Sequence, residues 1–269
     1  MLSDKLPQTQ GFEILSFKEL PILLLCAGKG SRMSSEAKGL HKSLVPLRQG
    51  TPGSLELLIR TFNRLRISSI YVVVGHKKEQ ILEKLESLTV AYTDLIPIDA
   101  ADEYEDGPLY SFLSAKDHLV SMPLFAILPA DTIFHPALFD TLRNIEYNAG
   151  YCYVFYYTTA QEPNDHDLVV ILGEDNRVLR VEEYYKMADR NHEFGGQYHL
   201  FIPFLVLNGY FFLYAEIGKE QGKTKLIEMI KPYIRSTKKF LAYEVTGAEP
   251  YFVDLDQPED FEKLDRVLR

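Results

Sequence analysis

Cysteine, long apolar runs and positive charge are all scarce in this 269-residue sequence. Its two cysteines, Cys26 and Cys152, cannot staple a secreted mini-fold or close a four-ligand zinc site, and both sit in apolar runs typical of reduced core thiols. The most apolar stretch, residues 201–215, is broken by polar and helix-breaking residues and is shorter than the ~20 residues that span a bilayer. The first residues lack the apolar core of a signal peptide, so we expect a cytoplasmic protein without membrane insertion.

The charge balance limits the possible partners. The chain has 38 acidic and 29 basic residues and a formal net charge of -9, which argues against a surface devoted to nucleic acid or anionic lipid. Hydrophobic residues make up 46% of it, as in an ordinary globular protein. If the substrate is an anion, a few local cations must therefore overcome an unfavourable overall field.

Strand and helix patterns alternate in the first half. Apolar runs predict strands at 22–26, 70–74, 90–92 and 124–128, and apolar spacing predicts helices at 55–65, 81–88, 109–119 and 138–145. Ser54 is placed to cap the first helix. Short connections between such elements favour a mostly parallel sheet that is covered on both faces.

The second half is richer in antiparallel patterns. It predicts an aromatic strand at 151–157, a hairpin at 168–181, an extended segment at 198–213, a helix from 226, strands at 240–245 and 250–253, and a final helix. No linker separates the halves. We therefore expect an α/β fold, a three-layer sandwich with a mixed, mostly parallel central sheet, in which residues 21–269 form one domain after an N-terminal extension, 1–20.

A glycine loop directly follows the first strand. It comprises Ala27, Gly28, Lys29, Gly30 and Ser31. Glycines let the backbone approach a ligand and expose N–H groups that suit phosphate oxygens. The dinucleotide fingerprint needs a third glycine where Met33 stands, and Gly222-Lys223-Thr224 lacks the glycine spacing of the other familiar phosphate loop.

Two cations follow this loop, Arg32 and Lys42. Arginine binds phosphate in a bidentate manner, and lysine offers a mobile point charge. Gly-x-Gly-x-Arg-Met followed by a lysine and the hydrophobic-proline segment 43–47 resembles the nucleotidyltransferases of the sugar-1-phosphate and MobA-like NTP transferase type, which have the nucleotide-diphospho-sugar transferase fold.

The resemblance continues to the end of the chain and implies further roles. Gly107 and Pro108 resemble the nucleotide-binding turn before a helix that closes on the base. Asp131 resembles the metal-binding aspartate after a buried strand, where the family usually has Gly-Asp and this chain has Ala-Asp. In the C-terminal block, Asp254 ends an apolar strand and is the better metal ligand, whereas Asp256 is explained by a helix N-cap role.

The acceptor side is implied by the same resemblance. Lys186 stands near the family's Glu-Lys element, and Asn208 and Gly209 resemble a following acceptor-side strand. Residues 21–150 would then be the nucleotide-binding half and 151–269 the acceptor-binding half.

The chemistry implied is transfer of an NMP from a nucleoside triphosphate to a phosphorylated small molecule, with release of pyrophosphate. The attacking phosphate oxygen is already anionic, which suits a sequence without a nucleophile–base motif. Arg32 would bind the β- and γ-phosphates, Lys42 would lie near the α-phosphate, and Asp131 and Asp254 would hold Mg²⁺. The first expectation for the acceptor is a sugar 1-phosphate. A CTP-dependent cytidylyltransferase acting on phosphocholine or another phosphorylated alcohol is the alternative, and a glycosyltransferase or a nucleotide-binding sensor of the same fold is more remote.

Overall fold

The parallel part of the sheet has three of its four strands where the sequence predicts them. The computed structural model describes residues 13–30, 39–187, 196–247 and 251–267. The strands of the first half are β2 (Ile22–Cys26), β3 (Ser69–Val74), β4 (Asp94–Asp99) and β5 (Phe125–Pro129). They are parallel and adjacent in the order β5-β2-β3-β4. Their carboxyl ends therefore meet at one edge, where ligands of such sheets bind.

The second half adds antiparallel strands to the same sheet. These are β8 (Cys152–Thr159), β9 (Leu168–Leu172), β10 (Val178–Glu183), β11 (Tyr198–Leu207) and β12 (Phe240–Glu244). Strand β11 is antiparallel to β5, β8 and β9, while β12 is parallel to β8. The sheet is therefore mixed, and parallel pairing prevails only in its first half.

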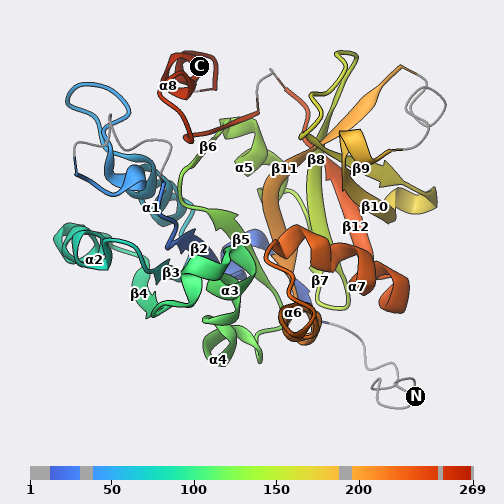
Figure 1. The fold of residues 1–269 in the computed structure, drawn as a ribbon, viewed down its shortest axis with the longest axis horizontal. Helices are drawn as coiled ribbons and strands as arrows, with labels where there is room; N and C mark the ends of the chain where they lie inside the picture. Colours follow the sequence, from blue (N-terminus) through green and yellow to red (C-terminus); the bar gives the residue numbers. More distant parts are fainter. Residues whose placement is uncertain (1–12, 31–38, 188–195, 248–250, 268–269) are drawn as a thin grey trace.

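Helices cover both faces, as expected for a three-layer sandwich (Figure 1). Side chains of α1 (Ser54–Arg64), α2 (Lys78–Ser87) and α5 (Pro136–Arg143) share one buried cluster with one face of the strands. Side chains of α3 (Pro108–Leu113), α4 (Lys116–Leu119), α6 (Phe211–Glu220) and α7 (Ile230–Thr237) share a second cluster with the other face. Within the described ranges, no helix is both long and apolar enough to cross a membrane.

Two small strand pairs lie outside the main sheet. Strand β1 (Ile14–Leu15) pairs with β7 (Tyr147–Asn148), and β6 (Thr132–Phe134) pairs with β13 (Phe252–Asp254), which leads to α8 (Asp260–Val267). Single 3₁₀ turns complete the chain: η2 (Phe17–Glu19), η4 (Lys42–Leu44), η5 (Glu103–Asp106), η6 (Glu174–Asn176), η7 (Tyr184–Lys186) and η8 (Leu226–Met229). Phe17 is fully buried in the first cluster, so the described part of segment 1–20 contributes to the core.

Three local predictions were wrong. The strand expected at 90–92 is a turn, because the Asn63 side chain accepts the backbone N–H groups of Ala91 and Tyr92, and the strand begins at Asp94. The helix expected at 109–119 is split into α3 and α4. The extended segment ends at Leu207, and helix α6 follows, with apolar residues on both its buried and its exposed sides that hide the helical period.

Candidate active site

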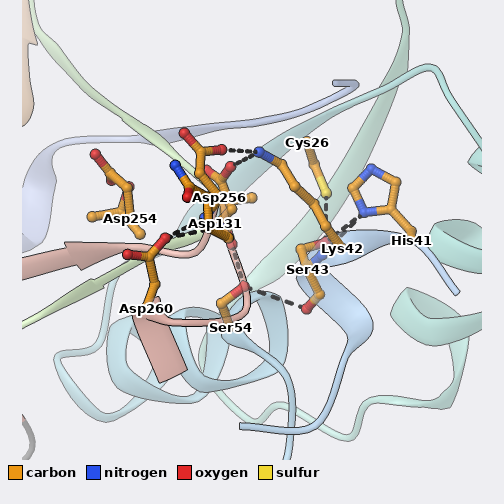
Figure 2. A network of polar contacts seen from close by, with 12 residues as sticks. Cys26, His41, Lys42, Ser43, Ser54, Asp131, Asp254, Asp256 and Asp260 are labelled. Carbon is orange, nitrogen blue, oxygen red and sulfur yellow. Dashed lines mark hydrogen bonds and ion pairs between the residues drawn. The ribbon is translucent and has the colours of Figure 1, made fainter. Parts of the chain in front are cut away.

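Lys42 lies between two carboxylates at the carboxyl edge of the parallel strands (Figure 2). Its Nζ forms an ion pair with Asp131 and a second, 3.2 Å long, with Asp256. The side chains of Lys42 and Asp131 are only 15% and 14% exposed, whereas that of Asp256 is 35% exposed. The structure therefore brings together one cation and two acids that are 89 and 214 residues away from it in the sequence, in a partly closed site.

Backbone pairing delivers the C-terminal block to Asp131. Strand β13 runs antiparallel to β6, so Asp254 lies opposite Thr132, whose hydroxyl donates a hydrogen bond to the Asp254 carboxylate. The backbone N–H of Leu255 then donates to the carbonyl of Asp131 at 3.0 Å. These bonds place Asp254 beside Asp131, as the sequence predicted.

The cap role predicted for Asp256 is wrong. Its carboxylate faces Lys42, and the carboxylate of Asp260 accepts the backbone N–H groups of Asp256 at 3.1 Å and of Gln257 at 2.8 Å. Asp260, the first residue of the last helix, thus holds the turn that leads into this helix. Sequence reasoning missed Asp256 as a site residue, although its spacing of two from Asp254 would place both on one side of an extended segment.

Electrostatics tie these groups together. Burial disfavours the charged form of Lys42, but the adjacent carboxylates of Asp131 and Asp256 outweigh it and raise the Lys42 pKa. Crowding by protein atoms and the negative charge of Asp131 raise the pKa of the Asp254 carboxyl, although one side of this residue is open to solvent. Two carboxylates thus share one ammonium group and a third, that of Asp254, lies near Asp131, a balance that favours a further cation.

The glycine loop lies against the stem of Lys42. Gly30 has a φ of +56°, and a Cβ at this position would come within 2.8 Å of the Lys42 Cδ. Only glycine fits both restrictions. Ala27 is buried, whereas Gly28 and Lys29 are exposed beside it. Ser31 and Arg32, which were predicted to bind the triphosphate, lie outside the described residues.

Gly107 and Pro108 begin α3 close to the same loop. Gly107 has a φ of +119°, and a Cβ there would lie 2.8 Å from the carbonyl oxygen of Thr224. Pro108 takes the first helical position, where its missing N–H is harmless. One turn earlier, Glu105 forms a 2.9 Å ion pair with Lys29 of the glycine loop. The predicted nucleotide turn is therefore joined to the loop by a direct contact.

Lys186 belongs to a cluster of charged side chains that also contains Glu183 and Lys225. Its Nζ lies 2.6 Å from Glu183, and Lys225, which follows Thr224, lies 2.9 Å from the same glutamate. Hydrogen bonds from these two lysines lower the pKa of Glu183 to about 2. All three residues line a cavity of about 520 Å³. Contacts thus run from the glycine loop through the Gly107 turn to Lys186.

The acceptor role predicted for Asn208 and Gly209 does not agree with the structure. Strand β11 is antiparallel to β5 and its Leu207 pairs with Phe125, so Asn208 lies at the opposite edge of the sheet from Asp131. The Asn208 carboxamide is buried and bonded to the hydroxyl of Tyr233. Gly209 packs on the backbone of Val120, whose oxygen would lie 2.0 Å from an added Cβ.

Ser54 supports the site and does not cap a helix. Gly53 is the N-cap residue of α1, and the Ser54 hydroxyl donates to the carbonyl of Ala130 at 2.7 Å. Because Ala130 directly precedes Asp131, this bond holds the backbone next to Asp131 in place. Ser54 is fully buried, so its hydroxyl requires such a partner.

The donor set suits Mg²⁺ better than a metal held by protein alone. In the part of the chain that the structure describes, no group of three or more His, Cys, Asp or Glu side chains is arranged to hold an ion. Two carboxylates nevertheless converge on one point, now taken by the Lys42 ammonium. Mg²⁺ is commonly held by one or two carboxylates, water and substrate phosphates, and these residues fit that pattern.

Known proteins resemble the chain in sequence and in fold. Residues 22–200 match the family described as the MobA-like NTP transferase domain. The bifunctional protein GlmU of Methanococcus aeolicus is 25% identical over 239 residues, which are 88% of this chain and 52% of the relative. The choline-phosphate cytidylyltransferase of Haemophilus influenzae is 26% identical over 60% of this chain and 61% of its own length. The chain spans about half the length of the GlmU relatives it matches.

Solved structures share the whole fold. The inositol-1-phosphate CTP transferase of T. maritima has a TM-score of 0.71 at 13% identity and covers 94% of this chain and 98% of its own. The CTP:phosphocholine cytidylyltransferase LicC of Streptococcus pneumoniae has a TM-score of 0.65 at 18% identity, with 93% and 100% covered. These likenesses confirm the predicted α/β fold with a mixed central sheet. The family match covers more than half of the chain, which therefore belongs to the MobA-like NTP transferase domain family.

Proposed function

We propose that the protein transfers an NMP from a nucleoside triphosphate to a phosphorylated small molecule, most readily a sugar 1-phosphate, with release of pyrophosphate. The observation that carries this proposal is the position of Lys42, held between Asp131 and Asp256 beside a glycine loop. Such a site can bring two anions together and neutralise the charge that develops between them.

The residues of this chain would act mainly by positioning. An oxygen of the acceptor phosphate attacks the α-phosphorus, and pyrophosphate leaves on the opposite side. Lys42 would neutralise charge at the α-phosphate, backbone N–H groups of the glycine loop would hold the triphosphate, and Arg32 would bind its β- and γ-phosphates. No protein nucleophile is needed, because the attacking oxygen is anionic.

Asp131, with Asp256 and Asp254, would hold Mg²⁺. When bound, the ion supplies charge stabilisation to the phosphoryl oxygens. With two carboxylates already shared by Lys42, the ion and the ammonium compete for the same negative charge. We therefore expect the Mg²⁺ requirement to depend more on Asp131 and Asp256 than on Asp254, which differs from the pair that the sequence predicted.

The acceptor would bind in the half of the chain that contains Lys186. Lys186 and Lys225 carry positive charge and line a cavity, and residue contacts connect this cavity with the nucleotide turn. The cytidylyltransferase alternative has its own support, since one relative is named choline-phosphate cytidylyltransferase, and two fold neighbours are named inositol-1-phosphate CTP transferase and CTP:phosphocholine cytidylyltransferase. Both described cysteines are free and buried, which suits the reducing cytoplasm that we propose as its location.

The direct test is release of pyrophosphate. Purified protein is incubated with Mg²⁺, each of the four triphosphates in turn, and a panel of sugar 1-phosphates, phosphocholine and inositol 1-phosphate. We expect one pair to react, and Asp131→Asn to lose at least ~100-fold in rate. Asp140→Asn, which removes an exposed carboxylate from α5, is the control. Consumption of a nucleotide sugar without pyrophosphate release would overturn the proposal in favour of a glycosyltransferase.

A parallel titration tests the metal ligands. Asp256→Asn should raise the Mg²⁺ concentration needed for half-maximal rate by more than Asp254→Asn does. Equal or reversed effects would show that the ammonium and the ion do not share Asp256.

A further inference from the structure

His41, the residue before Lys42, has a buried ring that the proposed chemistry does not use. His41 as a whole is only 2% exposed. The Nδ1 atom accepts the backbone N–H of Ser43 at 3.3 Å and lies 2.9 Å from the Ser43 hydroxyl, which in turn is 3.2 Å from the Cys26 sulfur. His41 is thereby the N-cap of the turn that begins with Lys42 (Figure 2).

This bonding pattern assigns the proton of the ring. Since Nδ1 accepts a backbone N–H, the neutral imidazole carries its hydrogen on Nε2. Burial, followed by the charge of Lys42, lowers the pKa of His41 to about 4, so the ring is neutral at physiological pH. Nε2–H is therefore a buried hydrogen-bond donor.

Nε2 has no hydrogen-bond partner among the residues that the structure describes. A buried donor without a partner is costly, and in native proteins such a group requires an explanation. The main chain of Gly28 is close enough to favour protonation of the ring, but the pair does not meet hydrogen-bond geometry. The centroid of the His76 ring lies 6.5 Å from that of the His41 ring. The free donor therefore lies next to the glycine loop.

The orientation of the peptide unit between Gly28 and Lys29 decides where the Lys29 N–H points. In a planar trans peptide, the carbonyl oxygen of one residue and the N–H of the next point in opposite directions. If the buried His41 ring holds the Gly28 carbonyl on the inner side, the Lys29 N–H is directed outward, where Gly28 and Lys29 are exposed. An N–H so directed suits a phosphate oxygen.

We propose that His41 is a positioning residue whose Nε2–H donates to the Gly28 carbonyl when a triphosphate binds, which directs the Lys29 N–H at a phosphate oxygen and fixes the loop relative to Lys42. This inference rests on the proposed function, because it needs a nucleoside triphosphate at the glycine loop. His41 itself touches neither substrate.

Two substitutions separate this role from simple capping. Asparagine is among the best N-cap residues, so His41→Asn keeps an acceptor for the Ser43 N–H and removes the Nε2 donor. Glutamine is longer, so His41→Gln keeps an amide donor near the Nε2 position and weakens the cap. Triphosphate affinity is measured by thermal shift and calorimetry, and KM is measured separately for triphosphate and acceptor.

We expect His41→Asn to bind triphosphate ~10-fold more weakly, the effect of about one hydrogen bond. The acceptor KM should stay within about twofold, and His41→Gln should keep most of the affinity. Wild-type affinity in His41→Asn, with loss confined to His41→Gln, would show that His41 only caps the turn and would overturn the inference.

A second measurement follows the wild-type protein, and a variant is used only to assign the resonance. The spectrum of the ¹⁵N-labelled histidines, with His41 assigned by its absence in His41→Asn, should show an Nε2–H tautomer whose proton resonance moves downfield when a non-hydrolysable triphosphate is added. An unchanged resonance at saturating triphosphate would overturn the inference. If the wild type binds triphosphate and the resonance moves but no acceptor releases pyrophosphate, the transferase proposal fails while the role of His41 stands. If it binds no triphosphate, both fail.

Discussion

Replacing Lys42 with methionine tests whether the ion pairs at the site are as tightly coupled as the structure indicates. The substitution keeps the apolar stem that packs on Gly30 but removes the ammonium between Asp131 and Asp256. Removing one partner of a fully buried pair costs about 3–5 kcal/mol, because the remaining charge is left uncompensated. Lys42 and Asp131 are 15% and 14% exposed, and Asp256 is 35% exposed. Solvent screening therefore reduces the expected loss to about 2–3 kcal/mol.

The assay is thermal unfolding at pH 7 in the presence of a chelator. For a chain of this length, the expected loss corresponds to a fall in Tm of about 5–10 °C. Lys78→Met is the matched control, since Lys78 pairs with Asp99 across 2.8 Å but both side chains are well exposed. Because water screens exposed pairs, this variant should lose much less stability than Lys42→Met.

Mg²⁺ then discriminates further between explanations. In Lys42→Met the two carboxylates lack their internal cation, so added Mg²⁺ should restore stability to this variant more than it stabilises the wild type. A Lys42→Met protein whose stability in chelator is within about 0.5 kcal/mol of the wild type would refute the coupling. A weaker Mg²⁺ response than that of the wild type would refute shared use of the carboxylates.

The remaining predictions concern the loop, the acceptor side and the buried histidine. Gly30→Ala should destabilise the protein by about 1–2 kcal/mol, since its φ is +56°, whereas Gly28→Ala, with no atom within 4 Å of the added Cβ, should leave the urea midpoint nearly unchanged. Asn208→Ala should lower stability by about 1–2 kcal/mol through its lost buried hydrogen bond and leave the acceptor KM unchanged. Lys186→Ala should raise the acceptor KM and leave stability nearly unchanged. A raised acceptor KM in Asn208→Ala would contradict the placement of Asn208 away from the site. The pKa of His41 is lowered from an ordinary 6.5 to about 4 in the folded protein. Between these two values the unfolded chain binds a proton on His41 that the folded protein does not, so the wild type loses stability as the pH falls through this window. The urea midpoints at pH 7 and pH 4.5 should therefore differ less in His41→Asn than in the wild type, and equal differences would contradict a lowered His41 pKa.

Local patterns in the sequence were sufficient for three of the four parallel strands of the first half, β2, β3 and β5. A buried strand can be recognised by a short apolar run, and the residue that follows it is polar or glycine when the chain turns at the carboxyl edge. The Gly28 loop after β2 and Asp131 after β5 were found in this way, and parallel pairing of these strands brings them to one edge. The fold class followed from the same alternation of strand and helix.

The orientation of the C-terminal block required tertiary contacts. Asp254 and Asp256 are two residues apart near a strand end, and both an N-cap and a site role are compatible with that pattern. The pairing of β13 with β6 and the bonds to Asp260 decide that Asp256 turns toward Lys42. The buried supports, Ser54 and His41, also belong to this class, since a serine at a helix start or a histidine in a loop has no distinctive local pattern.

Strand direction explains the largest error. Asn208 follows an apolar strand just as Asp131 does, and the sequence alone gives the two residues similar settings. Because β11 runs antiparallel to β5, the two residues lie at opposite edges of the sheet. The sequence by itself determined most strands of the main sheet, where the glycine loop lies and which family the chain resembles. Only the tertiary structure decided which strand ends face the same cleft and which carboxylates meet Lys42, because hydrogen-bond pairing between distant segments sets strand direction and side-chain orientation.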